Sequence, residues 1–329
     1  PVITDLTLTS PFHVPQGQTV IPQAIVERSE NAANRQETQS RPDCMPCAEC
    51  TAMVTYLTPD METQKHRSES ATLYIDYPTG VYDVRREFHN NRPELKKLDS
   101  LMRPLTEGNL ASISSISICG YASPDGTYKD NEILASNRAR CFKEYMHTTY
   151  APEHDLYKVS SVPEDWDGLV ELLQLRPMNH GDEVLSLIAR TSIFEGREKQ
   201  LMDMYGGTVY RELLKSYFPQ LRRIRITVGY EARAFNIEEA ASLIYTHPRL
   251  LSLQEMYRVA AFYRPGTEQY REIYEIAAYH FPDDVLANIN AASAVIMAGD
   301  PVSARQYLNK VADDPRAWND FGVLAYLEG

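Results

Sequence analysis

An arginine and the polar turn that precedes it are the residues of this sequence best suited to bind a ligand. The stretch 123–126 (SPDG) has the residue order of a type I turn, and Thr127 or Asp130 can cap a helix after it. If that helix starts near Asn131, Arg138 lies about 10 Å along its axis. Because helical side chains lean toward the N-terminus, the guanidinium can reach back to the turn. With the N–H groups of the helix start it would form a pocket for an anion.

A strand before the turn and a helix after it must position this arginine. Ile116 and Ile118 alternate with polar neighbours, which is the period of a half-buried strand. After the turn, Leu134, Phe142 and Met146 recur on one helical face, and Arg138 lies on the same stripe. The sequence therefore predicts a strand over 113–121 and a helix over 130–147.

Three short motifs in the chain match a known pattern. The pattern G-(H/Y)-x-D-x-x-G is matched by Gly120, Tyr121 and Gly126. The pattern N-x-x-L-S-x-x-R-A is matched by Asn131, Leu134, Arg138 and Ala139, with Ala135 in place of the serine. The segment 222–226 (RRIRI) is similar to R-R-V-x-I, and 71–77 and 91–98 look like a first strand and helix. The chain thus resembles the outer-membrane protein A C-terminal (OmpA-like) domain family, peptidoglycan-associating modules of Gram-negative envelopes, in a variant with a Gly-Tyr-Ala-Ser-Pro-Asp-Gly loop.

The resemblance implies roles for individual residues. In the family, the arginine that matches Arg138 binds the carboxylate of the diaminopimelate side branch of peptidoglycan, and an aspartate binds its ammonium. Here the aspartate position is Ser123, and Asp125 substitutes only if the loop bends differently. Loss of a charge-assisted hydrogen bond costs about 1.5–3 kcal/mol, or about ten- to hundredfold in affinity. The candidate peptidoglycan-binding residues are Arg138, Ser123, Asp125, Asn131, Tyr121 and Arg223. The alternative is that Arg138 is structural, paired to a local acid and holding the turn.

Length and charge narrow the class of protein. The 329 residues suffice for two or three domains. A net charge of −12 argues against nucleic acid or an anionic membrane as the main partner. The sequence has no apolar run long enough to span a bilayer. Its start at Pro1, without a methionine or a signal peptide, fits a processed, exported protein of the periplasm or outer membrane.

The chain has five cysteines, and their spacing is compatible with several chemical states. Cys44, Cys47 and Cys50 form C-x-x-C-x-x-C, which is compatible with a metal or iron–sulfur site, but the sequence places no fourth ligand close by. In an oxidising envelope we expect one local disulfide with a cysteine left over, or free thiols, rather than a metal. Cys119 and Cys141 are expected to be free, buried thiols.

Three segments follow from the pattern of the chain. Residues 1–67 look β-rich, with alternation over 2–8 and 51–57 and a polar stretch at 31–43. For residues 68–235 the resemblance implies an α+β, OmpA-like core, a mixed sheet with helices on one face. Its expected strands are 71–77, 113–121, 156–162 and 222–232, and its expected helices are 91–106 and 130–147. A helical insertion occupies about 163–220, with helices near 164–175, 181–190 and 195–217, and a break around Met202–Gly207.

The segment 236–329 is predicted to be a tail of helical hairpins. Trp318, Phe321 and Gly322 are similar to the W-x-x-L-G opening of a tetratricopeptide repeat. Thirty residues earlier the same slots hold Asn288, Ala291 and Ala292; Ala304, Leu308 and Val311 fit the second helix of the repeat, and Pro315 its closing proline. Five tyrosines of the tail, Tyr257, Tyr263, Tyr270, Tyr274 and Tyr279, either line a peptide-binding face or pack between helices.

The sequence contains only weak indications of an enzyme. Glu164-Asp165-Trp166-Asp167 contains paired carboxylates of the kind sugar-cleaving enzymes use, but they follow Pro163 at a predicted helix start, where acids favour the helix dipole. We find no nucleophile elbow, phosphate loop, dinucleotide fingerprint or zinc-protease motif, and we expect no cofactor.

We therefore expect a non-catalytic envelope protein whose core associates with peptidoglycan and whose tail binds a protein partner. One alternative is an envelope or fimbria-assembly adaptor that does not bind peptidoglycan. A muralytic enzyme that uses Glu164 is the remaining alternative.

Overall fold

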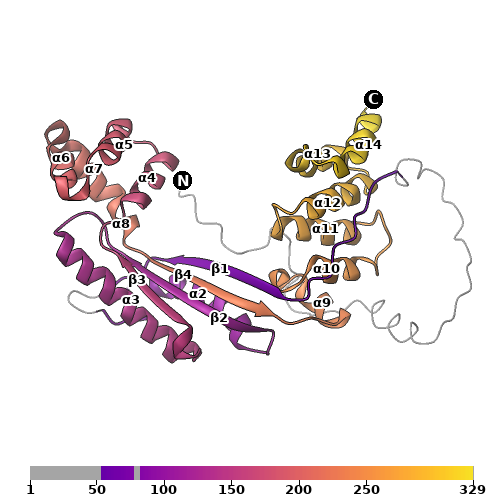
Figure 1. Cartoon of the computed structure of the whole chain (residues 1–329), viewed down its shortest axis with the longest axis horizontal. Coiled ribbons are helices and arrows are strands. Elements are labelled where there is room, and N and C mark those ends of the chain that lie inside the picture. The colour runs from indigo at the N-terminus through magenta and orange to yellow at the C-terminus, as the bar shows by residue number, and fades with distance from the viewer. Residues whose placement is uncertain (1–52, 78–81, 329) are drawn as a thin grey trace, which may run out of the picture. The chain divides into compact units, whose positions relative to one another are not determined.

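A computed structural model describes residues 53–77 and 82–328 (Figure 1). The strand expected over 2–8, the polar stretch 31–43 and Cys44, Cys47 and Cys50 lie outside the described residues. The chain divides into two compact units: His66–Glu231 form one, and the residues up to Lys65 together with Ala232 onward form the other. We call them the sheet unit and the helical unit and describe each by itself.

A four-stranded mixed sheet is the centre of the sheet unit. Its strands are β1 (Lys65–Leu73), β2 (Ala111–Tyr121), β3 (Tyr157–Val162) and β4 (Ile224–Ala232), in the order β1-β4-β2-β3. Strands β2 and β3 are parallel, with Ile116 opposite Tyr157 and Tyr121 opposite Val162. The helix between them is the crossover that a parallel pair needs. A mixed α/β core is therefore confirmed.

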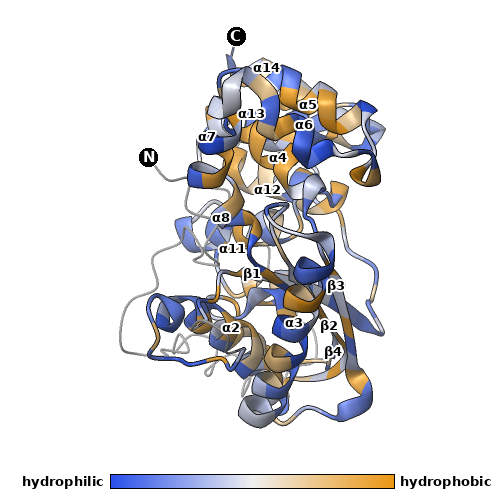
Figure 2. Cartoon of the chain, turned by 90° about the vertical axis from the view of Figure 1, so that its left-hand side faces the viewer, coloured by the Kyte–Doolittle hydropathy of each residue, from blue (hydrophilic) through white to orange (hydrophobic). Residues whose placement is uncertain are grey.

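Helices α2 (Asn91–Thr106) and α3 (Tyr128–Tyr150) lie side by side against the sheet (Figure 2). They cover the apolar side of β2, where Ile116 and Ile118 are fully buried. At Gly120 the fit is so close that a Cβ atom would lie 2.4 Å from the carbonyl oxygen of Ala135 and 3.1 Å from Cβ of Ala139. Only glycine allows α3 to approach the strand this closely.

The first strand was predicted six residues too late, at 71–77 instead of Lys65–Leu73. Polar residues fill most of β1 (KHRSESATL), so hydrophobic alternation did not indicate it. After Leu73 the backbone is bound by side chains of α2 instead of by a strand. Glu94 accepts from the N–H of Tyr74 at 3.0 Å, and Asn91 accepts from that of Asp76 at 2.7 Å.

The predicted helical insertion is present between β3 and β4. It comprises α4 (Trp166–Leu175), α5 (Gly181–Arg190), α6 (Arg197–Asp203), α7 (Thr208–Ser216) and the short α8 (Phe218–Leu221). These helices share a hydrophobic cluster of their own, which contains Trp166, Leu169, Leu187 and Phe218. The helix expected over 195–217 is broken at the predicted place, because Tyr205, Gly206 and Gly207 all have positive φ.

Consecutive helices build the helical unit. They are α9 (Ile237–Leu243), α10 (Leu253–Ala260), α11 (Glu268–His280), α12 (Val285–Met297), α13 (Pro301–Leu308) and α14 (Trp318–Glu328). The small residues Ala291 and Ala292 are fully buried in α12, and Ala304 and Leu308 are fully buried in α13, which packs against it. Trp318, by contrast, is 63% exposed. The helical nature of the tail is confirmed, whereas the tetratricopeptide arrangement stays a prediction.

Residues 53–57 are not part of a β-strand, contrary to the prediction for 51–57. They lack regular secondary structure, because side chains of α12 and α14 take up their backbone N–H and C=O groups. The alternation of Val54, Tyr56 and polar neighbours arises from packing on helices and not from a sheet.

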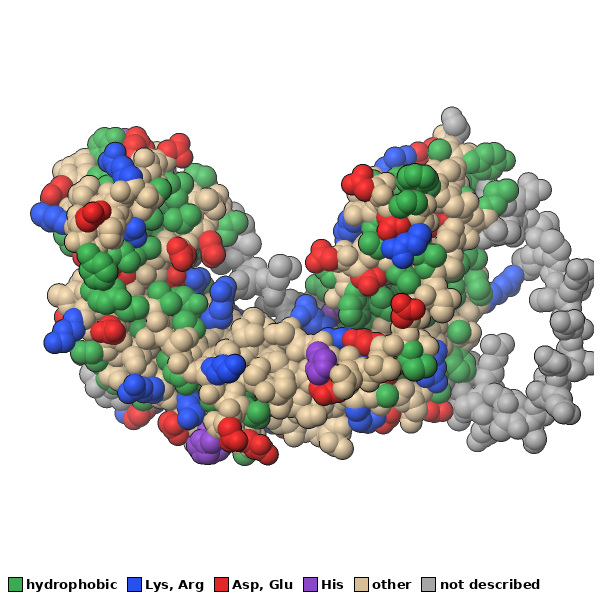
Figure 3. Space-filling model, in the orientation of Figure 1, with side chains coloured by type: hydrophobic (Ala, Val, Ile, Leu, Met, Phe, Trp, Pro, Cys, Tyr) green, Lys and Arg blue, Asp and Glu red, His purple; other side chains and the backbone are tan. Residues whose placement is uncertain are grey.

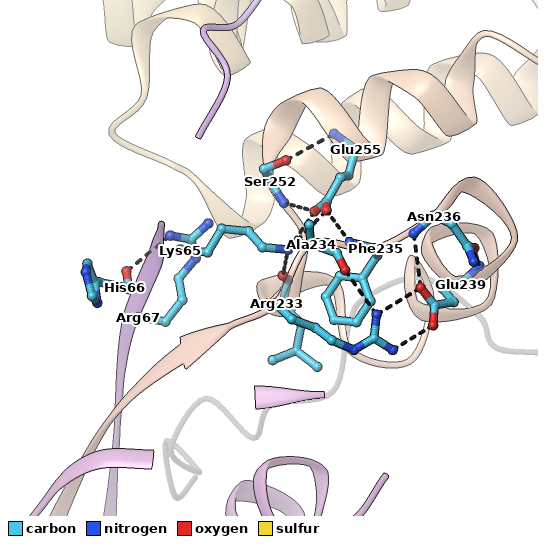
Figure 4. A network of polar contacts seen from close by, with 11 residues as sticks. Lys65, His66, Arg67, Arg233, Ala234, Phe235, Asn236, Glu239, Ser252 and Glu255 are labelled. Carbon is cyan, nitrogen blue, oxygen red and sulfur yellow. Dashed lines mark hydrogen bonds and ion pairs between the residues drawn. The ribbon is translucent and has the colours of Figure 1, made fainter. Parts of the chain in front are cut away.

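A buried ion pair fixes the start of the helical unit (Figure 4). Lys65 is 3% exposed, and its Nζ donates to both carboxylate oxygens of Glu255 at 3.1 and 2.9 Å and to the carbonyl of Leu250 at 3.0 Å. Glu255 also accepts from the backbone N–H groups of Phe235 and Ser252, each at 2.8 Å. Both charges are thus fully hydrogen-bonded, as buried charges require.

Acidic and basic side chains are interspersed in the view of Figure 3. Within the described ranges, no helix is long and apolar enough to cross a membrane.

Candidate ligand site at the turn before α3

The turn before α3 is fixed by local hydrogen bonds. A bend runs over Pro124–Gly126, and Gly126 has φ +102°, a conformation that favours glycine. Asn131 Nδ2 donates to the carbonyl oxygens of Ser123 at 3.0 Å and Asp125 at 3.2 Å. Of the two predicted caps, Thr127 is the one used, and it accepts from the N–H of Asp130. The turn is therefore a rigid platform at the N-terminus of α3.

Arg222 binds the two turn residues that the resemblance singled out. Its Nε donates to Ser123 Oγ at 2.9 Å, and a terminal nitrogen lies 2.8 Å from Asp125 Oδ2. Ser123 is buried, and the Arg222 side chain is 42% exposed. A guanidinium thus joins the turn to the residues just before β4.

Arg138 points inward and carries an unsatisfied donor. Its guanidinium lies 5.4 Å from the centre of the Tyr77 ring, and its buried Nε has no hydrogen-bond partner among the described residues. Burial lowers the pKa of Arg138, and the nearby positive charge of Arg222 lowers it further. No carboxylate within 53–77 or 82–328 pairs with it at ion-pair distance. The expected structural alternative, a local acid that neutralises Arg138, is therefore not what these residues provide.

Two more buried polar atoms near Arg138 and the turn lack partners in the described part of the chain. They are the hydroxyl of Tyr77 and Oδ1 of Asp125. Burial raises the pKa of Tyr77, so its hydroxyl is a neutral donor. Unsatisfied buried groups are rare in folded proteins, and clusters of them are typical of functional sites. Here the Arg138 guanidinium lies beside the Tyr77 ring, and Arg222, the second guanidinium, acts on Arg138 and binds Asp125. Such a set is suited to a ligand that carries both a carboxylate and an ammonium.

The other candidates, Tyr121 and Arg223, make a different contact. The Arg223 guanidinium lies 4.9 Å from the Tyr121 ring centre and pairs with the buried Asp165 at 2.8 Å. Burial raises the pKa of Asp165, while the charge of Arg223 opposes that rise. Arg222 and Arg223 are neighbours in sequence but have different partners. The structure thus joins Ser123, Asp125 and Asn131 in the turn and places Arg138 near Tyr77 and Arg222, whereas Tyr121 contacts Arg223, which pairs with Asp165.

The acids at the start of α4 have structural partners. Asp165 is the N-cap of this helix and accepts from the N–H of Gly168 at 3.0 Å. Glu164 accepts from the indole N–H of Trp166 at 2.8 Å, and burial raises its pKa. Trp166 belongs to the hydrophobic core of the insertion.

Arg222 and Tyr77 were missed as candidates, although the sequence contained a signal for both. Tyr77 follows Leu73 and Ile75 at intervals of two, so it shares their buried side. Arg222 has the same relation to the buried Ile224 and Ile226. The similarity of 222–226 (RRIRI) to R-R-V-x-I had placed Arg223, and not Arg222, among the candidates.

One of the two described cysteines lies near this site, because Cys141 acts on the pKa of Tyr77. Cys119 and Cys141 are free, as predicted, but half-buried instead of fully buried. In the residues that the structure describes, no group of three or more His, Cys, Asp or Glu side chains is arranged to hold a metal ion.

In comparisons with known proteins, no family model matches the sequence, and no curated protein matches it.

Proposed function

We propose that this chain is a non-catalytic protein of the Gram-negative cell envelope, in the periplasm or at the outer membrane. Its sheet unit, an OmpA-like domain in this proposal, associates with the stem peptide of peptidoglycan. Its helical unit, a tetratricopeptide-like tail, binds a protein partner. The motif resemblance and the geometry around Arg138 support the first part. Buried polar side chains on α12 and α14 of the helical unit support the second.

The buried Nε of Arg138, without a partner among the described residues, is the observation that carries the peptidoglycan proposal. A buried guanidinium costs stability unless a carboxylate or another acceptor satisfies it. Arg222 nearby makes the surroundings still less favourable to an unpaired cation. Both groups gain when a ligand brings a carboxylate, and the side branch of diaminopimelate ends in one next to an ammonium.

Asp125 would take the role that the family gives to the residue at position 123. Its Oδ1 is buried and unpaired in the described part of the chain, while its Oδ2 is held by Arg222. An ammonium next to Oδ1 would receive a charge-assisted hydrogen bond. Ser123, whose hydroxyl accepts from Arg222, then serves to orient that arginine.

Binding to purified sacculi tests this proposal with a matched pair of variants. We expect Arg138→Ala to reduce retention at least thirtyfold, because removal of one partner from a buried charge pair costs about 2–5 kcal/mol. Arg140→Ala, an exposed arginine of the same helix, should be retained like wild type. Equal retention of the Arg138→Ala variant would refute the site.

A soluble tripeptide refines the assignment of the charged group. A peptide that ends in meso-diaminopimelate should bind, whereas one with lysine, which lacks the second carboxylate, should bind at least tenfold more weakly. The same difference should disappear in Arg138→Ala. Equal affinity of the wild type for both peptides would exclude recognition of that carboxylate.

An adaptor without peptidoglycan binding is the second candidate function. The ion pair between Arg222 and Asp125 favours it, because this contact already occupies one oxygen of the proposed ammonium ligand. In that case crosslinked partners should depend on the helical unit, and no variant of Arg138 should change them. Retention on sacculi would then be absent from the wild type as well.

A further inference from the structure

Residues 53–58 lie as an extended segment on α12 and α14, and their main chain is bound by side chains. Asn290 accepts from the N–H of Leu57 and donates to its carbonyl, both at 2.7 Å. Asp320 accepts from the N–H of Thr55 at 2.7 Å, and the hydroxyl of Ser293 donates to the Thr55 carbonyl at 2.5 Å. All these contacts lie inside the helical unit. We call the segment the strap and the surface beneath it the groove.

The polar residues of the groove are placed where a helix would otherwise be apolar. Asn290 is 1% exposed, and Ser293 and Asp320 are fully buried. The flanking residues of α12 are mainly alanine, isoleucine and valine. Ser293 also bonds to the Ile289 carbonyl of α12 and to Asp320 Oδ2, at 3.1 and 2.6 Å. The buried amide of Asn290 and the remaining oxygen of Asp320 need further partners. The N–H and C=O groups of an extended chain supply them, which is the chemistry of a site for peptides.

One aromatic side chain anchors the strap. The ring of Tyr56 lies 5.5 Å from that of Tyr274 and 6.0 Å from that of Tyr270, and its hydroxyl is 3.2 Å from Sδ of Met297. Val54 and Leu57 pack against the apolar cluster of α12 to α14. Three of the five tyrosines expected to line a peptide face or to pack between helices, Tyr257, Tyr270 and Tyr274, form one ring cluster at this place.

We propose that the groove is a binding site for an extended segment of a partner protein with an aromatic residue flanked by apolar ones, and that the strap occupies it as an internal competitor. This inference rests on the proposed function of the helical unit and names the chemistry of its partner. The bonds that Asn290, Ser293 and Asp320 make to Leu57 and Thr55 go to main-chain atoms, so a foreign peptide can replace them. The side chain of Thr55 accepts one further bond, from Asn319 at 2.9 Å. Specificity then comes from the ring pocket for Tyr56.

The competition has a quantitative consequence. A segment joined to its site through a short connection acts at a local concentration in the millimolar range. A partner peptide must therefore displace it, and its apparent affinity is lowered by about 10²- to 10⁴-fold relative to a free groove. Weakening the strap should expose the affinity of the groove.

Fluorescence anisotropy with the full chain tests this. The probe is a labelled peptide with the sequence of Met53–Pro59 (MVTYLTP). We expect Tyr56→Ala to bind the probe at least tenfold more tightly than wild type. Tyr326→Ala, which removes a tyrosine that is 71% exposed, should bind like wild type.

The groove itself is tested on the same background. Adding Asn290→Ala to Tyr56→Ala should weaken binding at least tenfold, because it removes both hydrogen bonds to Leu57. Adding Asn309→Ala, at an exposed position in the same unit, should not. If the Tyr56→Ala variant is folded by circular dichroism and binds the probe no better than wild type, the inference is overturned. Sacculus binding would not be affected by that outcome, so the two proposals fail separately.

Hydrogen exchange of the wild type gives an answer even if Tyr56→Ala does not fold. The amides of Thr55 and Leu57 should exchange at least a hundredfold faster than those in the middle of α12, since a displaceable strap opens without unfolding the helices. Equal protection would mean that the strap is an integral part of the unit, and the inference would be wrong.

Discussion

Two cations with buried nitrogen atoms, Lys65 and the half-buried Arg138, have opposite surroundings. Lys65 in the helical unit has a carboxylate and a carbonyl within hydrogen-bond distance. Arg138 in the sheet unit has an aromatic ring, another arginine nearby and a buried Nε without a partner among the described residues. The first arrangement stabilises the fold. The second costs stability, and our proposal is that a ligand offsets that cost.

Replacement of Lys65, the cation with hydrogen-bond partners, should have the largest effect on stability. Lys65→Met leaves the buried Glu255 carboxylate without its counter-charge, and we expect the free energy of unfolding to fall by about 3–5 kcal/mol. Urea denaturation of the full chain measures it. Lys96→Met, at an exposed position, is the control. Glu255→Gln in the Lys65→Met background should recover part of the loss, and no recovery would show that packing, not charge, is what Lys65 supplies.

Ligand binding should stabilise the wild type but not a variant that lacks Arg138. At a concentration of diaminopimelate tripeptide a hundred times its dissociation constant, we expect a gain of about 2.7 kcal/mol. In Arg138→Met the same peptide should leave the melting temperature unchanged. A similar gain in both proteins would place the binding site elsewhere.

An unsatisfied histidine extends the comparison to the helical unit. Both ring nitrogens of His280 lack partners among the described residues, and burial, together with Arg249, lowers its pKa from 6.5 to about 4. Between these values the unfolded chain binds more protons than the folded one, so stability falls as the pH drops from 6.5 to 4. Because the ring is only partly buried, we expect a loss of about 1–2 kcal/mol.

Thermal melts at pH 7.5 and 4.5 measure this pH dependence. His280→Leu should reduce the difference between the two pH values, whereas His66→Leu, at an exposed position, should not. An unchanged difference in His280→Leu would assign the acid sensitivity to other groups.

Replacement of the unsatisfied cation should have the smallest effect on stability, and in the opposite direction. We expect Arg138→Met to raise the free energy of unfolding by about 1 kcal/mol, because it removes a buried donor that lacks a partner. Arg140→Met should change it by less than 0.5 kcal/mol. A loss of stability in Arg138→Met would instead support the structural role in which Arg138 holds the turn.

Local signals predicted much of the sheet unit. Alternation at Ile116 and Ile118 and the helical stripe of Phe142 and Met146 identified β2 and α3, and the residue order of the turn identified the start of the helix. These elements bury one face and expose the other, so their period is visible in the sequence. Strand β1 was misplaced because its residues are mostly polar.

The candidate site was predicted only in part. Ser123, Asp125 and Asn131 belong to one continuous stretch, and local geometry was enough to bring them together. Arg138 follows on the same helix, α3. Arg222 and Tyr77 come from other parts of the chain. Their spacing places each on the buried side of its segment, but only the sheet topology shows which residues they meet. The strap was mistaken for a strand for the same reason: its partners are more than two hundred residues away in the sequence.

The close approach at Gly120 has a consequence for the depth of the site. The two residues of α3 that a methyl group at position 120 would meet, Ala135 and Ala139, flank Arg138 in the sequence. Any side chain at 120 would push this turn of the helix away from the strand and carry the guanidinium outward with it. The absence of a side chain at Gly120 therefore sets how deeply the Arg138 guanidinium lies, and so how far a ligand must reach to contact it.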